Sequence, residues 1–600
     1  MLNRFIAQTM PTPALTRRGF LKLSAGATGG LMLGAALRPV SAAAQGGVDG
    51  LATPFVHIRP DNTVVVIVKH LDKGQGTATG LATLVADELD ADSAQVTTEF
   101  APANTDLYAN TLMGVQGTGG STAMANSWQQ YREAGATARA MLIAAAAQTW
   151  GVDPASISIA GGQITDGSQS ASLGDMAETA AGQSVPESVT LKTPDQWVYI
   201  GKSFPRVDVV RKSQGATNMY GMDVAMEGLV YAVSLRSPRF GGVLAGLDAT
   251  EARAMPGVID VIQLPDRATV IAESTWQAIQ ARDALSAEWD FSQAENRGTE
   301  ELRAEYTALL DEEGIAFHSA VVSQADTEQV IEADYSFPYL AHTPMEPIDV
   351  TVRFDGTEAT FWTGSQIQTL DQNIGAQVLG IDPGSVSIET LWGGGSFGRR
   401  AIYDSHYVAE AAMIAKAWLE AHGDARPIKL VWTREDDVRG GYYRPMHMHR
   451  VRAGLDADGN ITSWEQRVVG QGIAIGTAFE QFMVRDGVDA SSVEGLGEHS
   501  AYTIPGWSVD IHHPEVGVPV LWWRSVGHTH TAYVVETMMD ELAEAAGADP
   551  VEFRLRYLTD PRARGVLELA IDKAGTVPDG LTRGIAVHKS FGSYVAEVAD

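Results

Sequence analysis

The chain has 600 residues, of which 45% are hydrophobic and 20% charged, so it can bury several cores and is not a single small binding module. It carries 43 Lys and Arg against 74 Asp and Glu, and the formal net charge of −31 argues against nucleic acid as a partner. It contains no cysteine, which excludes disulfides, thiolate zinc sites, a cysteine nucleophile and iron–sulfur clusters held by this chain.

The first 44 residues resemble a twin-arginine export signal. An Arg pair at 17–18 is followed by Phe20-Leu21-Lys22, by an uncharged Gly- and Ala-rich stretch, and by small residues up to Ala44. The apolar stretch is shorter than the roughly 18 residues that indicate a membrane-spanning helix, and no other segment is a candidate. We therefore expect a periplasmic protein, exported in folded form and without an integral membrane span. Export in folded form hints at a cofactor enzyme.

Two glycine turns in the N-terminal part each lead into a helix. A β-branched run at 63–69 predicts a strand, and apolar residues at 81–89 share one helical face. Between them lies Gly74-Gln75-Gly76. A second turn, 117–122, precedes a long Ala-rich helix that we expect to end at Gly151.

Shifts in composition divide the rest of the chain. A polar stretch closes an N-terminal segment at 45–200, and a mixed β and α unit follows at 201–295. A charged, weakly patterned linker, which we expect to be partly helical, covers 296–325. The remaining strands and helices, 326–600, form the last unit. Within it the pattern predicts a helix that ends at Gly547.

The C-terminal end has clear local signals. Pro550 suits the first turn of a helix, and Asp549 is its natural N-cap. Two strand-like runs follow, at 585–587 and 594–598. Because a terminal strand without a partner leaves unpaired backbone groups, we expect that the sequence lacks its C-terminal portion.

A third glycine-rich turn offers an anion-binding site. The strand predicted at 385–389 is followed by Gly393-Gly394-Gly395-Ser396-Phe397-Gly398-Arg399-Arg400, with a helix expected from about Tyr403. Glycines let backbone N–H groups approach an anion closely, and the two Arg add charge for phosphate. The run also satisfies G-x-G-x-x-G, so a nicotinamide-dependent dehydrogenase is an alternative, although the expected acid does not lie at a second strand tip. A turn that only packs a helix on a sheet is the third interpretation.

Four motifs in the second half of the chain belong together. They are Thr343-Pro344-Met345-Glu346-Pro347, Trp362-Thr363-Gly364-Ser365-Gln366, the glycine-rich run that ends at Arg400, and Trp523-Arg524-Ser525-Val526-Gly527-His528. In combination they resemble the molybdopterin-binding subunit of the xanthine dehydrogenase family, most closely the isoquinoline 1-oxidoreductase beta subunit type. The likeness runs from about residue 55 to residue 600. It implies a multidomain α+β fold, that of a molybdenum hydroxylase large subunit, with an α/β hammerhead domain at 201–295 and molybdopterin-binding regions on either side.

The resemblance also implies roles for individual residues. Gln366 matches a glutamine that hydrogen-bonds an oxygen ligand of molybdenum, and Arg444 matches an arginine that orients the substrate. Molybdenum is held by the pterin dithiolene in this family, so no protein ligand to the metal is expected. The N-terminal turns match loops that come late in xanthine dehydrogenases, which implies a permuted order. The cofactor contacts implied are Gln75, Gly76, Gly119, Ser121, Thr122, Gly394, Gly395, Phe397, Gly398, Arg399, Arg524, Ser525, Val526 and Gly527.

Two departures from the family pattern limit this transfer. Val526 stands where xanthine enzymes have an aromatic residue that packs on the substrate, so the pocket shape does not carry over. The general-base glutamate of the family lies in a Gly-x-Gly-Glu motif, which we expect beyond Asp600. Glu498 ends a similar run, but it precedes the Trp523 motif and lies in a polar stretch, so we do not assign the base to it.

The resemblance implies an exported molybdenum hydroxylase that oxidises an N-heteroaromatic compound or an aldehyde, with water as the oxygen source. Its expected cofactor is molybdenum with molybdopterin cytosine dinucleotide. Because the chain has no cysteine to hold clusters, we expect a small [2Fe-2S] partner subunit. An NAD-dependent dehydrogenase that uses the 393–398 loop and an inactive periplasmic binding or scaffold protein are the alternatives.

Two weaker patterns have ordinary explanations. The histidine pairs 447/449 and 528/530 could ligate a metal from one face of a strand, but we favour packing or hydrogen-bonding roles. The run 456–460 begins like a calcium loop, yet Ile461 and Arg467 occupy positions that such a loop gives to Gly and Glu. A hairpin turn is the better interpretation.

Overall fold

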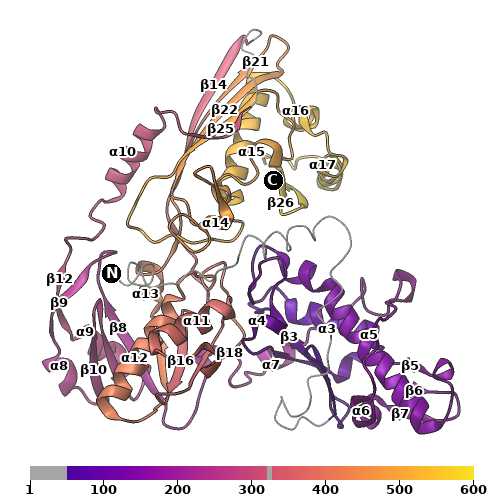
Figure 1. Ribbon diagram of the computed structural model, residues 1–600. Helices are drawn as coiled ribbons and strands as arrows, with labels where there is room; N and C mark the ends of the chain where they lie inside the picture. Colours follow the sequence, from indigo (N-terminus) through magenta and orange to yellow (C-terminus); the bar gives the residue numbers. More distant parts are fainter. Residues whose placement is uncertain (1–49, 320–326) are drawn as a thin grey trace.

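The structure is a computed structural model that describes residues 50–319 and 327–600 (Figure 1). The export signal predicted at 1–44 lies outside these residues. The described chain forms three lobes, each with its own sheets and hydrophobic core, which confirms the predicted multidomain α+β fold. Within these ranges no helix has the length and apolar character needed to cross a membrane. We call the lobes N-terminal (50–226), central (227–295 and 342–442) and C-terminal (296–319, 327–341 and 443–600).

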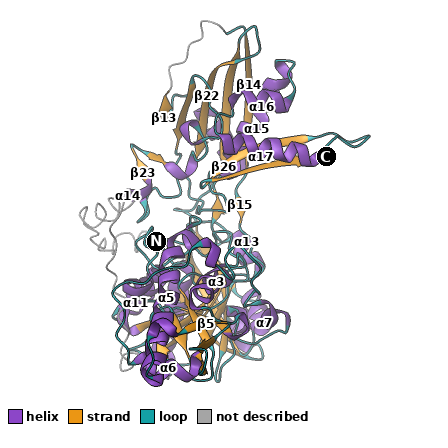
Figure 2. Ribbon diagram, turned by 90° about the vertical axis from the view of Figure 1, so that its right-hand side faces the viewer, coloured by secondary structure: helices purple, strands orange, loops and turns teal. Residues whose placement is uncertain are grey.

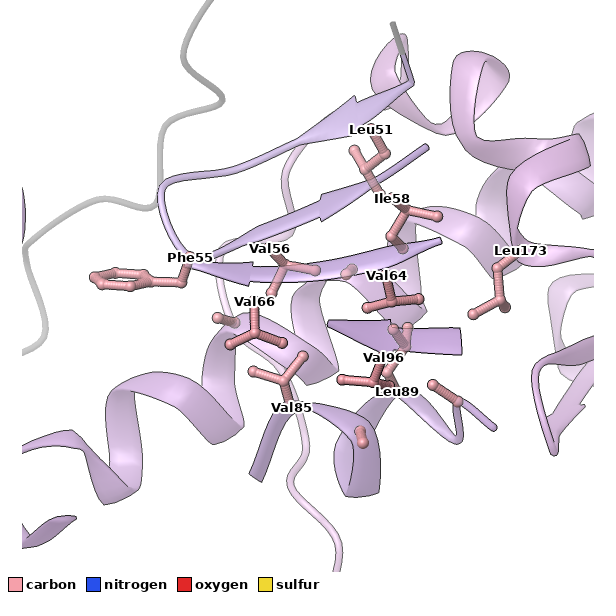
Figure 3. Close-up of a cluster of buried hydrophobic side chains, with 14 of the residues drawn as sticks. Leu51, Phe55, Val56, Ile58, Val64, Val66, Val85, Leu89, Val96 and Leu173 are labelled. Carbon is pink, nitrogen blue, oxygen red and sulfur yellow. The ribbon is translucent and has the colours of Figure 1, made fainter. Parts of the chain in front are cut away.

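The N-terminal lobe is built on a four-stranded sheet in the order β1-β2-β3-β4. Strands β3 and β4 pair in parallel, and α3 connects them. Figure 3 shows side chains such as Val66 and Val85 packed together in the core of this lobe. Helix α5 packs on α3 and ends, as predicted, at Gly151, whose φ of 68° closes it.

The elements of this lobe are β1 (Leu51–Ala52), β2 (Val56–Ile58), β3 (Val64–Val68), α3 (Thr77–Leu89), β4 (Val96–Phe100), α4 (Thr105–Tyr108), α5 (Thr122–Trp150), β5 (Ser158–Ala160), β6 (Gln163–Thr165), β7 (Ser170–Ser172), α6 (Leu173–Ala181) and α7 (Val209–Ser213). Strands β5, β6 and β7 form a small sheet of their own.

The central lobe contains a seven-stranded sheet in the order β10-β11-β8-β19-β16-β17-β18. Its strands come from both 201–295 and 326–600, and the parallel pair β8–β19 joins the two contributions. The residues predicted as an α/β hammerhead domain therefore share a sheet with the last unit. Its elements are β8 (Val230–Arg236), β9 (Val243–Asp248), α8 (Thr250–Ala254), β10 (Val258–Leu264), β11 (Arg267–Ala272), α9 (Thr275–Asp283), β12 (Ser286–Asp290), β16 (Asp349–Phe354), β17 (Ala359–Thr363), α11 (Gln368–Leu379), β18 (Val386–Thr390), α12 (His406–His422), β19 (Ile428–Val431) and α13 (Arg434–Arg439).

The C-terminal lobe carries a five-stranded sheet in the order β13-β25-β22-β21-β14, and α15 packs against it (Figure 2). The predicted hairpin turn joins β21 to β22, where the Asp456 carboxylate accepts hydrogen bonds from the N–H groups of Asp458 and Asn460. The predicted cap is also confirmed, because the Asp549 carboxylate accepts the N–H groups of Val551 and Glu552 at the start of α16.

The structure adds to two predictions for this lobe. The linker contains helix α10, in line with its expected helical part, and also strand β13, which pairs with β25. The two terminal runs pair with each other in an antiparallel hairpin. The elements are α10 (Thr299–Leu309), β13 (Ile315–Ser319), β14 (Gln329–Phe337), β15 (Leu340–Ala341), β20 (Tyr443–Arg444), β21 (His447–Leu455), β22 (Ile461–Gly470), α14 (Glu480–Met483), β23 (Val484–Arg485), β24 (Val488–Asp489), β25 (Trp507–His512), α15 (His528–Ala545), α16 (Pro550–Tyr557), α17 (Pro561–Ala574), β26 (Gly584–Ser590) and β27 (Ser593–Ala599).

Candidate functional site

The glycine turns predicted at distant points of the sequence lie together where the lobes meet. The N–H of Gly393 donates to the carbonyl of Asp72 at 3.0 Å, which joins the first turn to the third. The N–H of Arg524 donates to the carbonyl of Phe397 at 2.8 Å, which joins the third turn to the Trp523 motif. The fold therefore assembles one site from segments of all three lobes.

Gln366 joins the second turn to the third. Its side chain is buried, its Nε2 donates to the carbonyl of Thr118 at 2.7 Å, and its Oε1 accepts the Ser396 hydroxyl at 2.6 Å. The N–H of Thr118 in turn donates to the carbonyl of Gln366 at 2.9 Å. Gln366 thus joins the turn before α5 to the glycine-rich loop after β18.

The first turn is shaped by its own side chains. The Asp72 carboxylate accepts the N–H groups of Gly74 and Ala78, both at 2.9 Å. Gln75 Oε1 accepts the N–H of Lys73 at 2.8 Å, and Gln75 Nε2 donates to the carbonyl of Leu71 at 2.8 Å. The amide of Gln75 therefore holds the turn closed in this conformation.

The second turn presents an uncapped helix end. Ser121 is the N-cap of α5 with a φ of 55°, and its side chain makes no capping hydrogen bond. Thr122 Oγ1 donates to the carbonyl of Gly119 at 2.7 Å, which fixes the turn. The N–H of Thr122 donates to the carbonyl of Gly119 at 3.1 Å, while the next two N–H groups of this 29-residue helix, those of Ala123 and Met124, have no acceptor among the described residues. The helix dipole favours a negative charge there.

The third turn forms a concave row of backbone donors. Gly395, Phe397 and Gly398 have φ values of 101°, 56° and 109°, and the described residues supply no acceptor for the N–H groups of residues 395–398. Successive free N–H groups in such a turn form an anion-binding nest. Gly394 is held by Glu346, whose carboxylate accepts its N–H at 2.8 Å.

The two arginines after this nest do not supply the free charge that the sequence predicts for phosphate. Arg399 is buried and pairs with Asp437 at 2.8 Å, and Arg400 is buried and pairs with Glu346 at 3.0 Å and Asp349 at 3.6 Å. Their charges are therefore neutralised inside the protein. The helix that follows was expected from about Tyr403 but begins at His406, which is eight residues after Gly398. This separation does not support a dinucleotide-binding turn, in which the glycines open the helix directly.

The Trp523 motif carries strained backbone and a free cation. Ser525 and Val526 have φ values of 73° and 48°, a region that is costly for a β-branched residue. Arg524 is exposed, its guanidinium carbon lies 5.7 Å from the centre of the Phe397 ring, and it forms no ion pair with a described residue. A Cβ added at Gly527 would overlap the carbonyl oxygen of Ser491.

Glu494 is a neighbour of this motif that sequence reasoning missed. Its carboxylate accepts the N–H of Gly527 at 3.1 Å, and burial raises the pKa of Glu494 to about 7. No local pattern marks it, because its partner lies on a separate segment. Glu498, which we did not assign as the base, is exposed.

Arg444 is buried beside the histidine cluster. Its Nη2 donates to the carbonyl of Pro338 at 2.8 Å, its Nε lacks an acceptor, and no carboxylate among the described residues pairs with it. His449 and His530 share a hydrogen bond of 2.8 Å, and the His447 and His530 rings stack at 3.8 Å between centroids. Burial lowers the pKa of all three histidines, so they are neutral.

The histidines that the sequence pairs as 447/449 and 528/530 are grouped differently in the structure. His530 joins the two histidines of β21, whereas His528 points away and hydrogen-bonds His588 at 2.8 Å. Across residues 50–319 and 327–600, no group of three or more His, Cys, Asp or Glu is arranged to hold a metal ion.

The arrangement fits an anionic, oxygen-rich guest such as molybdopterin. Turns with unused N–H groups meet at one point, and Arg524 adds an unpaired positive charge in a protein whose net charge is −31. A Cβ at Gly394 or Gly398 would overlap Glu346 or the carbonyl oxygen of Trp522, so these glycines let the loop pack closely against its neighbours while its backbone N–H groups stay uncovered. Such a set of donors suits phosphate and carbonyl oxygens.

Comparison with known families agrees with this geometry. Two family descriptions match the chain, at residues 24–226 and 313–558, and each is of a molybdopterin cofactor-binding domain. Together they include the three glycine turns, Gln366 and the Trp523 motif.

Curated relatives cover most of the chain. It is 28% identical over 581 residues to the membrane-bound aldehyde dehydrogenase (pyrroloquinoline-quinone) of Gluconacetobacter polyoxogenes, covering 91% of this chain and 72% of that protein. It is 26% identical over 660 residues to the beta subunit of isoquinoline 1-oxidoreductase from Brevundimonas diminuta, covering 98% and 82%. It is 26% identical over 556 residues to a nicotinate dehydrogenase subunit of Pseudomonas putida, covering 87% and 44%.

Solved structures with similar folds are longer than this chain. Quinoline 2-oxidoreductase from Pseudomonas putida 86 aligns with a TM-score of 0.48 and 19% identity, over 61% of this chain and 53% of that one. The chain thus spans about half the length of this structure. On the two domain matches and the curated relatives, the chain belongs to the molybdopterin-binding subunits of the xanthine dehydrogenase family of molybdenum oxidoreductases.

Proposed function

We propose that the chain is the catalytic subunit of an exported molybdenum hydroxylase. It oxidises an N-heteroaromatic compound or an aldehyde, takes oxygen from water and passes electrons to a small [2Fe-2S] subunit. The observation that carries this proposal is the meeting of the three glycine turns, of which the second and third are joined by Gln366 and keep N–H groups without an acceptor among the described residues. The names of the relatives support both substrate classes, since they include aldehyde, isoquinoline and nicotinate enzymes.

The residues of the chain position the reaction, while the bound cofactor supplies a metal that activates water and accepts two electrons. The Gln366 amide is fixed at both ends, and its second Nε2 proton remains for an oxygen atom of the guest. The buried guanidinium of Arg444 offers donors to a carbonyl or ring acceptor of the substrate. The 600 residues contain no cysteine, so electrons leave through another protein. Two relatives are likewise named as subunits.

Cofactor analysis tests this proposal. The protein is produced in a host that makes molybdopterin, and molybdenum is measured by mass spectrometry together with the fluorescence of the oxidised pterin. We expect near-stoichiometric molybdenum and pterin, and release of cytidine monophosphate on acid hydrolysis, which identifies the cytosine dinucleotide form. Bound pyrroloquinoline quinone or NAD in a preparation free of molybdenum would refute the proposal.

Two further measurements address export and the partner. Conservative Lys substitutions at both Arg17 and Arg18 should keep the protein in the cytoplasm, because the twin-arginine pair is then lost. Unchanged periplasmic yield would contradict the export route. A tagged chain should co-purify with a small protein that contains iron and absorbs visible light, and a preparation without iron would contradict the expected partner.

A further inference from the structure

Lys73 lies at the junction of the first and third turns. It stands between Asp72, whose carbonyl accepts the N–H of Gly393, and Gly74. A Cβ built on Gly393 would lie 3.2 Å from the Cβ of Lys73. The side chain of Lys73 therefore starts directly against Gly393, at the beginning of the glycine-rich loop.

The ammonium group of Lys73 has no partner among the described residues, although the side chain is half-buried. Three other lysines that are removed from solvent are all satisfied. Lys69 donates to the carbonyl of Ala109 at 3.0 Å, Lys192 pairs with Asp90 at 2.6 Å, and Lys429 donates to the carbonyl of Met222 at 2.8 Å. A cation withdrawn from water without an acceptor is costly unless an anion joins it.

The surroundings of Lys73 add to this cost. Burial, and next the positive charge of Arg400, lower the pKa of Lys73 to about 8. The carboxylates of Glu346 and Asp349 lie close to Arg400, at 3.0 and 3.6 Å, and neither pairs with Lys73. No described residue thus compensates the positive charge of Lys73, whose side chain begins beside Gly393 of the glycine-rich loop.

We propose that Lys73 binds an anionic phosphate oxygen of the pterin cofactor, at the point where the 72–76 turn meets the 393–398 loop. The inference rests on the proposed function, because it requires that molybdopterin occupies this site. The ammonium group neutralises a phosphate charge that backbone N–H groups alone only solvate. Lys73 is then a positioning residue for the cofactor.

Cofactor content of matched variants tests the role of Lys73. Lys73→Met removes the charge and keeps the length of the side chain, Lys73→Arg keeps the charge, and Lys573→Met at the exposed end of α17 is the control. Molybdenum and pterin per chain are measured after gel filtration in low and high salt. We expect Lys73→Met to retain roughly tenfold less cofactor than the wild type, a loss typical of one charge-assisted contact. Lys73→Arg should retain most of it, and Lys573→Met all of it.

Thermal unfolding of the cofactor-free proteins separates binding from folding. Lys73→Met made in a host without molybdopterin should melt at or above the wild-type temperature, because an uncompensated charge has been removed. Full cofactor retention by Lys73→Met, or equal losses in Lys73→Met and Lys573→Met, would overturn the inference while the proposed function stands. A wild-type protein without molybdenum or pterin would overturn both.

Discussion

Four residues of the predicted cofactor turns hold backbone angles that cost free energy. Ser121, Phe397, Ser525 and Val526 all have positive φ, between 48° and 73°. Such angles cost on the order of 1–3 kcal/mol each and persist only where the surroundings enforce them. The N–H groups of Phe397 and Ser525 have no acceptor among the residues that the structure describes. The strained backbone therefore leaves the N–H groups of Phe397 and Ser525 available to bind a guest.

Gly398 allows the glycine-rich loop to meet the Trp523 motif. Its φ is 109°, and a Cβ there would overlap the carbonyl oxygen of Trp522. We expect Gly398→Ala to lower the free energy of unfolding by more than about 3 kcal/mol and to abolish cofactor retention. Gly380→Ala is the control, because Gly380 also has positive φ, 80°, but its Cβ would meet nothing within 4 Å. Urea denaturation should show that the free energy of unfolding of the control falls by only about 1–2 kcal/mol. An equal decrease in the two variants would contradict the steric explanation.

Glu494 gives the stability of the protein a pH dependence with a defined sign. The pKa of its carboxyl is about 7 in the folded protein against an ordinary value of 4.5. Between these two pH values the unfolded chain loses the proton while the folded protein keeps it. The contribution of Glu494 to the free energy of unfolding should therefore fall as the pH rises from about 4.5 to 7, and level off above that; it opposes the contribution of the buried histidines, whose pKa values are lowered.

Glu494→Gln should remove the contribution of Glu494 to the pH dependence of the free energy of unfolding. The difference in this free energy between the wild type and the variant at each pH gives the contribution. The Glu494 side chain is 25% exposed, so solvent screens part of the effect. We expect the free energy of unfolding to change by about 1–2 kcal/mol across this pH range, less than the full pKa shift would give. Urea denaturation at pH 5, 6, 7 and 8 measures it, and Glu498→Gln, which changes an exposed carboxylate, is the control. A pH dependence in Glu494→Gln that is the same as in the wild type would contradict the assignment to Glu494.

At the scale of elements, helices were predictable and sheet partners were not. The long helix α5 and the short helix α16 carry their own end signals, Gly151 and Asp549, within the local sequence. Strand β8 instead pairs with β19, which follows far along the chain, and no local pattern specifies that choice. The unit predicted at 201–295 therefore shares its sheet with the last unit.

Prediction of the site from the sequence has the same limit, because local patterns do not specify contacts between distant segments. Its glycine turns were predictable because left-handed backbone favours glycine and the motifs are contiguous. The side chain of Arg399 was expected near phosphate, but it turns inward to Asp437, which belongs to α13. Glu494 was missed for the same reason, since its partner Gly527 lies on a separate segment. Contacts between segments that are distant in sequence determine where the side chains of Arg399 and Glu494 lie, so local patterns do not predict them.

Gly135 sets the distance between α5 and α3. A Cβ at this position would lie 2.8 Å from the carbonyl oxygen of Val85 and 3.0 Å from the Cβ of Glu88. We expect Gly135→Ala to lower the free energy of unfolding by about 1–3 kcal/mol, because the helices must move apart. Gly565→Ala in α17 is the matched control, since nothing lies within 4 Å of its Cβ. The control should be stabilised by about 0.5–1 kcal/mol through helix propensity, and denaturant titration that finds Gly135→Ala equally stabilised would contradict close helix packing.

At the scale of the whole molecule, the turns that form the site are among the contacts that join the lobes. Thr118 and Gln366 join the N-terminal and central lobes, and Phe397 and Arg524 join the central and C-terminal lobes. Each contact uses backbone groups of strained or glycine-rich segments. A guest that binds these turns therefore also links the lobes, and its binding free energy adds to the stability of their arrangement.

Hydrogen exchange can measure this link directly. When cofactor-loaded and cofactor-free protein are compared by mass spectrometry, peptides that contain residues 119–121 and 395–398 should exchange more slowly in the loaded form, because their N–H groups gain acceptors. Peptides from the paired strands β21 and β22 should not change, since their N–H groups are already bonded within the sheet. Uniform slowing across the chain would indicate general stabilisation, and no slowing in the two turns would place the cofactor elsewhere. Protection confined to the turns would mean that the guest itself closes the junction between the lobes.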